Sequence, residues 1–106
     1  MMSNVRYQSR LLTTTAVEVT ASAVVFKLPN RAFALTCRCG VVLVNIAQTV
    51  PTGTTTSLPV LFESNGQTQA ATTVGGAAIT ASDVSTGVYQ FYFDKTNNIL
   101  QVLGQI

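Results

Sequence analysis

Hydrophobic and polar residues alternate with a period of two along most of this chain, a pattern typical of β-strands that bury one face. In GVYQFYFD, residues 87–94, the side chains of Tyr89, Phe91 and Phe93 share one face, so we expect this strand to anchor the core. Alternation or a short apolar run also predicts strands at 11–19, 22–28, 32–38, 41–48, 58–64, 67–73 and 99–104.

Turn signals separate these strands. Asn65-Gly66 is the strongest hairpin signal in the chain and should join the strands on either side of it. Residues 29–31, Pro-Asn-Arg, predict a second hairpin between 22–28 and 32–38. Pro59 indicates the start or the edge of its strand, because proline has no N–H to donate.

The remaining segments follow from the same reasoning. VVLVNIAQ, residues 41–48, is apolar on both faces over its first four residues, so we expect a central strand covered on both sides. We expect a loop at 49–57 and a short strand or a turn at 77–83.

These elements predict an all-β fold, an antiparallel β-sandwich or small barrel of about eight short strands. Residues 11–106 form a single domain in this interpretation, and residues 1–10, which lack a strong period, form an N-terminal arm. An extended arm can add a strand to the open sheet edge of a neighbour. Our candidate partner-contact residues are therefore Val5, Arg6, Tyr7 and Arg10.

The composition is unusual in its low charge. Only 9% of residues are charged, against 47% that are hydrophobic, and threonine occurs 16 times. Either the chain is a soluble β domain with a threonine-rich surface, or partners normally cover part of that surface. The net charge of +2 is too small to indicate nucleic-acid binding. Five of the six basic residues precede residue 39, which leaves open a positive face for an acidic partner, although we favour scattered solvated side chains.

Cys37 and Cys39 are the first candidates for chemistry. A structural zinc site usually needs four ligands, and the chain has no histidine to complete one. A disulfide between them is disfavoured, because residues one apart on a strand point to opposite faces. We expect Cys37 to pack inside with Phe33 and Leu35, Cys39 to lie near a strand end, and no metal or cofactor to be bound.

Catalytic groups are scarce as well. Without histidine, a nucleophile would depend on Lys27 or Lys95 for activation, and no spacing supports that. The four carboxylates do not group along the chain, and Gly75-Gly76 lacks the glycine and lysine spacing of a phosphate-binding loop. We therefore expect no enzyme activity and no small-molecule substrate.

Two binding functions involve the aromatic residues. The strand with Tyr89, Phe91 and Phe93 could stack nucleic-acid bases, but it has no basic residue, so a core role is favoured and no nucleic-acid contact is expected. Sugar binding by a β-sandwich would need exposed aromatic side chains, for which Tyr7, Tyr89 and Tyr92 are the candidates.

No membrane or export segment is expected. No apolar run approaches the roughly 20 residues that span a bilayer. The segment RYQSRLLTTTAVEVTASA has basic residues and a small-residue end, but its apolar run contains three consecutive threonines and Glu18, which make a poor signal-peptide core.

The span from Gly40 to Ile106 resembles a family of short virion structural proteins of tailed bacteriophages that infect gut bacteria. The resemblance lies in the order of features: a buried strand VVLVNIAQ, then TVPTGTTTSLPVLF, a polar turn SNGQTQ, and the closing segment GVYQFYFDKTNNILQVLGQI. It implies a capsid decoration or cement protein that is assembled in the host cytoplasm. Its partners would be the major capsid protein and copies of itself, and its location the capsid surface of the virion. Alternatives are a head-fibre base, connector or tail protein, or a carbohydrate-binding or adhesin module.

Overall fold

The computed structural model describes residues 7–29, 39–94 and 99–106, with only the backbone of residues 7–10 and 39. Eight strands in these ranges form one sheet in the order β1-β4-β7-β8-β6-β5-β3-β2. The elements are β1 (Tyr7–Thr13), β2 (Ala16–Val19), β3 (Val24–Lys27), β4 (Cys39–Ile46), β5 (Val60–Ser64), β6 (Gln67–Thr72), a 3-10 turn η1 (Ala81–Asp83), β7 (Gly87–Asp94) and β8 (Ile99–Gln105).

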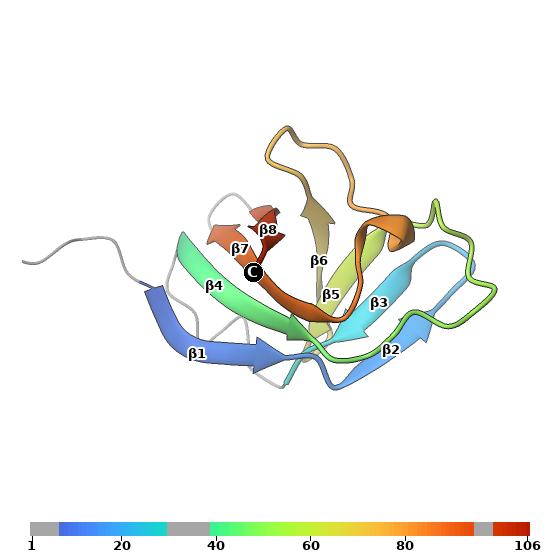
Figure 1. The fold of residues 1–106 in the computed structure, drawn as a ribbon, viewed down its shortest axis with the longest axis horizontal. Helices are drawn as coiled ribbons and strands as arrows, with labels where there is room; N and C mark the ends of the chain where they lie inside the picture. Colours follow the sequence, from blue (N-terminus) through green and yellow to red (C-terminus); the bar gives the residue numbers. More distant parts are fainter. Residues whose placement is uncertain (1–6, 30–38, 95–98) are drawn as a thin grey trace, which may run out of the picture.

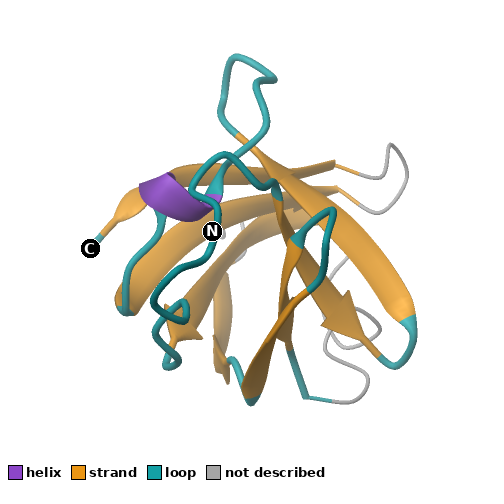
Figure 2. Cartoon of the chain, turned by 90° about the vertical axis from the view of Figure 1, so that its right-hand side faces the viewer, coloured by secondary structure: helices purple, strands orange, loops and turns teal. Residues whose placement is uncertain are grey.

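The sheet curls into a half-barrel, and one bend in the chain links its two end strands. β1 and β2 lie at opposite ends of the strand order, yet only Thr14 and Thr15 separate them in the chain. The N–H of Thr14 donates to the carbonyl oxygen of Asn45 in β4 (3.0 Å), and the N–H of Thr15 donates to that of Lys27 in β3 (2.8 Å). Figure 1 shows β1 leading into β2, and Figure 2 shows the strands arched around one interior.

The all-β class and the number of strands are confirmed, but the expected purely antiparallel pairing is wrong. Three of the seven neighbouring pairs, β1 with β4, β3 with β5 and β6 with β8, are parallel. Alternation along a strand specifies which face each side chain takes, but not which strand lies next to it. The sequence pattern therefore could not distinguish the mixed sheet from an antiparallel one.

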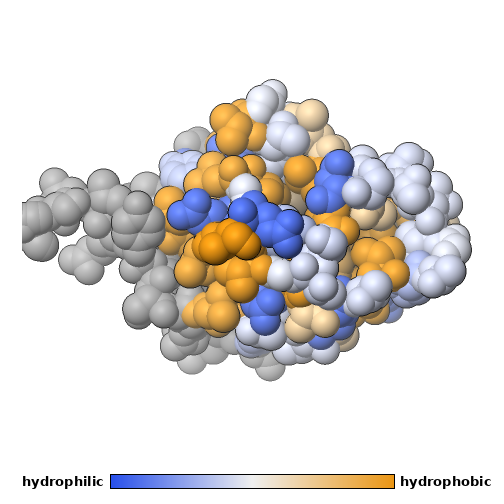
Figure 3. Space-filling view, viewed as in Figure 1, coloured by the Kyte–Doolittle hydropathy of each residue, from blue (hydrophilic) through white to orange (hydrophobic). Residues whose placement is uncertain are grey.

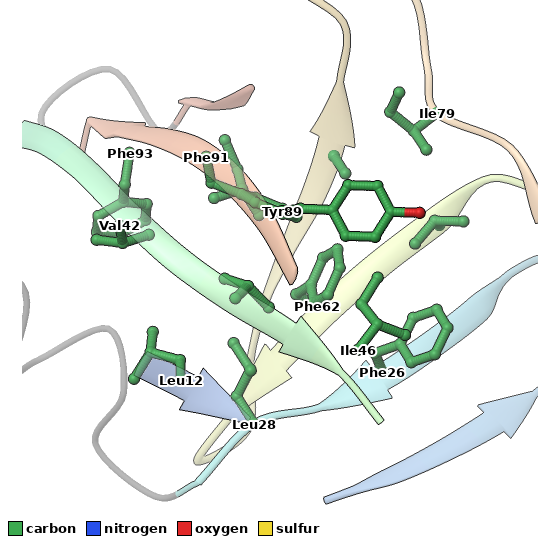
Figure 4. Packing of buried hydrophobic residues seen from close by; sticks show 14 of the residues in the cluster. Leu12, Phe26, Leu28, Val42, Ile46, Phe62, Ile79, Tyr89, Phe91 and Phe93 are labelled. Atoms are coloured by element: carbon green, nitrogen blue, oxygen red, sulfur yellow. The ribbon is translucent and has the colours of Figure 1, made fainter. Parts of the chain in front are cut away.

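The core lies inside the curl, around Phe62 (Figure 4). The ring of Phe62 stacks on that of Phe26, with centroids 5.6 Å apart, and meets the edge of Phe91 at 5.2 Å. Tyr89 packs on Phe91 at 6.4 Å, so β7 anchors the core as expected. Phe93 is buried as well, and the rest of the cluster is aliphatic: Leu12, Val24, Leu28, Val42, Val44, Ile46, Val60, Ala71, Ile79, Ala81 and Leu100.

Most turn predictions are confirmed. Asn65 (φ 53°) and Gly66 (φ 82°) form the two-residue turn between β5 and β6, where both positions require positive φ. Pro59 directly precedes β5, and 49–57 contains no strand. The segment 77–83 contains the η1 turn.

Other boundaries differ from the expectation. The strand expected at 11–19 is divided by the bend into β1 and β2. β1 begins at Tyr7, so residues 7–10 of the expected arm belong to the sheet, and residues 1–6 lie outside the described residues. The expected hairpin partner 32–38 also lies outside them, and both edges of β3 are taken by β2 and β5.

Candidate interaction surface

The outward side of β1, β4, β7 and β8 is the strongest candidate for a functional surface. In β4, Val42 and Val44 are buried in the core, so Val41 and Leu43 project outward, where they are half-buried. The same alternation holds along β7, over residues 11–13 of β1 and over residues 99–102 of β8. The register between β8 and β7 shifts beyond Val102, and Leu103 is included because its side chain is exposed. We call this side the outer face; its described side chains are Leu11, Thr13, Val41, Leu43, Asn45, Val88, Gln90, Tyr92, Gln101 and Leu103.

Strand register places these side chains in continuous rows. Leu11 of β1 lies opposite Leu43 of β4, and Leu43 lies opposite Gln90 of β7. Tyr92 of β7 lies opposite Val41 on one side and Gln101 of β8 on the other. Side chains in such cross-strand positions touch one another, so the apolar groups form one layer rather than isolated points.

The two flanking strands expose this layer most. Leu11 on β1 is 45% exposed and Leu103 on β8 is 41% exposed, although a leucine is normally buried. Figure 3 shows hydrophobic residues, interrupted by hydrophilic ones, gathered over β4 and around the C-terminus. Contiguous apolar surface rimmed by polar residues is typical of protein interaction sites.

The outer face is also nearly free of charge. None of the described side chains that define the face is charged, and Asp94, at the end of β7 beside the start of β4, lies at its margin. Its polar groups are the amides of Asn45, Gln90 and Gln101 and the hydroxyls of Thr13 and Tyr92. Recognition at this face would therefore depend on shape, apolar contact and neutral hydrogen bonds.

Charged groups instead cluster on the other half of the sheet. Lys27 of β3 forms ion pairs with Glu63 of β5 and, at 3.6 Å, with Glu18 of β2. The hydrogen bond that Lys27 donates to Glu63 is the main cause that raises the pKa of Lys27, and the negative charges of both carboxylates add to it. These ion pairs link three adjacent strands, and the two carboxylates outweigh the single ammonium by one negative charge.

A second carboxylate has a structural role. Asp83, at the end of η1, accepts hydrogen bonds from the N–H and the hydroxyl of Thr80, both at 3.0 Å. The bond from the Thr80 N–H is the main cause that lowers the pKa of Asp83. This capping box fixes the turn that precedes β7.

Neither the interior nor the carboxylates offer a ligand site in the part of the chain that the structure describes. A cavity of about 10 Å³ lies among Leu12, Leu28, Val42, Val44, Phe62, Phe91, Phe93 and Leu100, all apolar, and is at most the size of one water molecule. Within residues 7–29, 39–94 and 99–106, no three His, Cys, Asp or Glu side chains lie together. Cys37 is outside these ranges, and Cys39 is the first residue of β4, a strand end as expected.

The predicted partner-contact residues are only partly covered by the structure. Val5 and Arg6 lie outside the described residues. Tyr7 and Arg10 belong to β1, where Tyr7 pairs with Val41, but their side chains are not described. Residues 7–10 of the predicted arm thus belong to β1, one of the four strands of the outer face.

The three tyrosines considered for sugar binding differ in position. Tyr89 is 5% exposed, and its hydroxyl accepts a hydrogen bond from the Ser85 N–H at 2.9 Å, so it belongs to the core. Tyr92 lies on the outer face and is half-buried. The sequence reasoning missed the outer face, although the continuous apolar run at 41–44 was its signal. The second side of this strand, where we expected a cover, is the candidate interaction surface.

No protein-family model, no characterised protein and no solved structure matches this chain. No helix in the described residues has the length and the hydrophobicity needed to cross a membrane.

Proposed function

We propose that this chain is a structural protein of a bacteriophage virion, a non-enzymatic decoration or cement protein bound at the capsid surface. The proposal starts from the resemblance of residues 40–106 to short virion proteins. The observation that carries it further is the outer face, a four-strand surface of apolar and amide side chains with leucines exposed at both flanks.

The physical properties of this face suit assembly in many copies. Apolar contact is non-directional and keeps its strength when salt changes, whereas exposed ion pairs are screened. A shell presents many equivalent sites, so contacts that are weak one by one become effective together. A small rigid half-barrel with an apolar face is therefore sufficient for a cement role.

The major capsid protein is the proposed partner of the N-terminal arm. β1 borders the outer face, and residues 1–6 precede it directly. Arg6 and Arg10 supply positive charge there, and an extended segment can pair with a sheet edge of the shell through its main chain. In this proposal the arm attaches the protein to the shell, while the half-barrel remains outside.

The experiment that tests the function is the location of the chain in purified phage particles. Quantitative peptide mass spectrometry should find it in a copy number comparable with that of the major capsid protein, and electron cryomicroscopy should place an eight-stranded half-barrel on the capsid exterior. Absence from the particles would refute the proposal, and a few copies confined to the tail or the portal would favour the connector or tail alternative.

The arm is tested separately, by removing residues 2–6. This deletion spares β1, so the thermal unfolding midpoint should change little, while binding to capsid shells should fall at least tenfold. A truncated chain that binds shells like the full chain would show that the arm is not the attachment point.

Carbohydrate binding is a second candidate, favoured by the position of Tyr92 between the outward residues Gln90 and Gln101 of the same face. A glycan array should show binding that Tyr92→Ala abolishes with the fold retained. A blank array, or binding that Tyr92→Ala leaves unchanged, removes this candidate.

A further inference from the structure

We propose that the outer face is the surface through which two copies of this chain associate, sheet against sheet, and that the bare contact is weak. This inference rests on the proposed function and deepens it: the half-barrel would contact other copies of the chain, while the arm would contact the shell. It rests on the size, the charge and the hydrogen-bonding chemistry of the face.

The size of the face sets the strength of the contact. Its strands contain seven or eight residues each. Four strands about 4.8 Å apart and about 3.3 Å per residue give a flat area of roughly 450 Å². Because the sheet curls around the core, the outer face is convex, and two such faces would bury less than roughly 900 Å² in total. This is below the roughly 1,200 Å² at which stable interfaces begin and in the range of transient ones. The chain should thus be monomeric when dilute and associate at high concentration.

The charge of the face favours an uncharged partner surface, and an identical face is one. A partner with charged groups would have to bury them against leucine and valine with no opposite charge among the described outward side chains, apart from Asp94 at the margin. In a two-fold arrangement, Asp94 of each copy stays at the rim, where water solvates it.

The amides make the face complementary to itself. Gln90 and Gln101 each carry both a donor and an acceptor, so a two-fold rotation can bring an amide of one copy against an amide of the other with donors and acceptors matched. Leu11 and Leu103 lie on the two flanking strands of the face. The same rotation, with the strands of the two sheets roughly aligned, can place each flank of one copy over the opposite flank of its partner.

Effective concentration explains how a weak contact serves the proposed function. Copies attached to neighbouring sites of one shell reach millimolar local concentration, at which a weak pair is populated. The free chain would then remain dispersed until it binds the shell, and the pairing would stabilise the shell only after attachment.

Sedimentation velocity of the full chain from 10 µM to 1 mM tests the proposal. The weight-average mass should rise above the 11.2 kDa of one chain toward that of two. Leu11→Glu and Leu103→Glu should each keep the monomer mass over the whole range, because the two copies would bring carboxylates into an apolar contact. Val74→Glu is the matched control, since Val74 is 65% exposed but lies in the turn after β6, and it should associate like the natural chain.

Amide chemical shifts on dilution give a second measurement that does not need a variant. The shifts should move in β1, β4, β7 and β8 and stay constant in β2, β3 and β5. A mass that remains at 11.2 kDa at 1 mM, association that both leucine variants retain, or shifts confined to the other half of the sheet would each overturn the proposal. None of these results bears on whether the chain is found in phage particles, so the proposed function stands or falls separately.

Discussion

Replacing Thr14 by valine should open the bend that closes the half-barrel. Thr14 is 2% exposed, and its hydroxyl accepts a hydrogen bond from the N–H of Ala47 (2.9 Å) while donating one to the Oε1 of Gln48. The side-chain amide of Gln48 donates in turn to the Thr14 carbonyl oxygen (2.9 Å). Valine has nearly the shape of threonine, so the substitution removes the hydroxyl while creating almost no cavity.

The magnitude follows from the two hydrogen bonds that the hydroxyl makes. Each contributes about 1 kcal/mol net, so the free energy of unfolding should fall by about 2 kcal/mol. An unfolding entropy of about 2.1 cal/mol/K per residue gives about 220 cal/mol/K for this chain, so Tm should fall by about 9 °C.

Thermal and urea unfolding of Thr14→Val beside Thr13→Val is the assay. Thr13 is exposed on the outer side of β1, so the same substitution one residue earlier should change stability by less than about 0.5 kcal/mol. A double-mutant cycle with Gln48→Leu should give a coupling energy of about 1 kcal/mol, because the two side chains are in contact. If Thr14→Val is as stable as the natural chain, or if the stability effects of Thr14→Val and Gln48→Leu simply add, these hydrogen bonds do not hold the bend.

The remaining predictions concern a charge and a turn. The folded-state pKa of Lys27 is raised, so Lys27 contributes stability that is present below its unfolded pKa of 10.5 and is lost as the pH rises through the higher folded pKa. The Tm of Lys27→Met should therefore lie below that of the natural chain at pH 9, and the difference should shrink toward pH 12. A difference that stays constant over this range would contradict the ion pair with Glu63. Gly66→Ala should lower the free energy of unfolding in urea by about 1 kcal/mol, because Gly66 has φ 82°, in the left-handed region that disfavours a side chain. Gly75→Ala is the control, because the φ of Gly75 lies outside that region. Equal effects at both glycines would refute the role of backbone strain.

How much of this fold the sequence could predict depends on whether the signal is local. The turn at Asn65-Gly66 was predictable, because two adjacent positions with positive φ leave few residue types that fit. The inward face of β7 was predictable too, since Tyr89, Phe91 and Phe93 alternate with more polar residues. Both features are determined by neighbours in the chain.

The strand order was not predictable, because it is determined by segments far apart in the chain. The run from Leu11 to Val19 contains no glycine or proline that would signal a break, yet the Thr14 N–H bonds to β4 and the Thr15 N–H to β3. Nothing in a threonine pair distinguishes a bend between two sheet ends from a continuous strand. The hydrophobic pattern also does not predict the parallel pairs that result, such as Leu11 of β1 opposite Leu43 of β4.

The outer face follows from the same contrast between local and distant determinants. VVLV at 41–44 showed that both sides of β4 are apolar, and a single chain of this size has one interior to cover one side. The half-barrel buries Val42 and Val44, and it leaves Val41 and Leu43 half-buried on the outward side. In our proposal, the low charge of the whole chain and the second apolar side of β4 have one cause: the outward half of the sheet is adapted to contact with another protein surface.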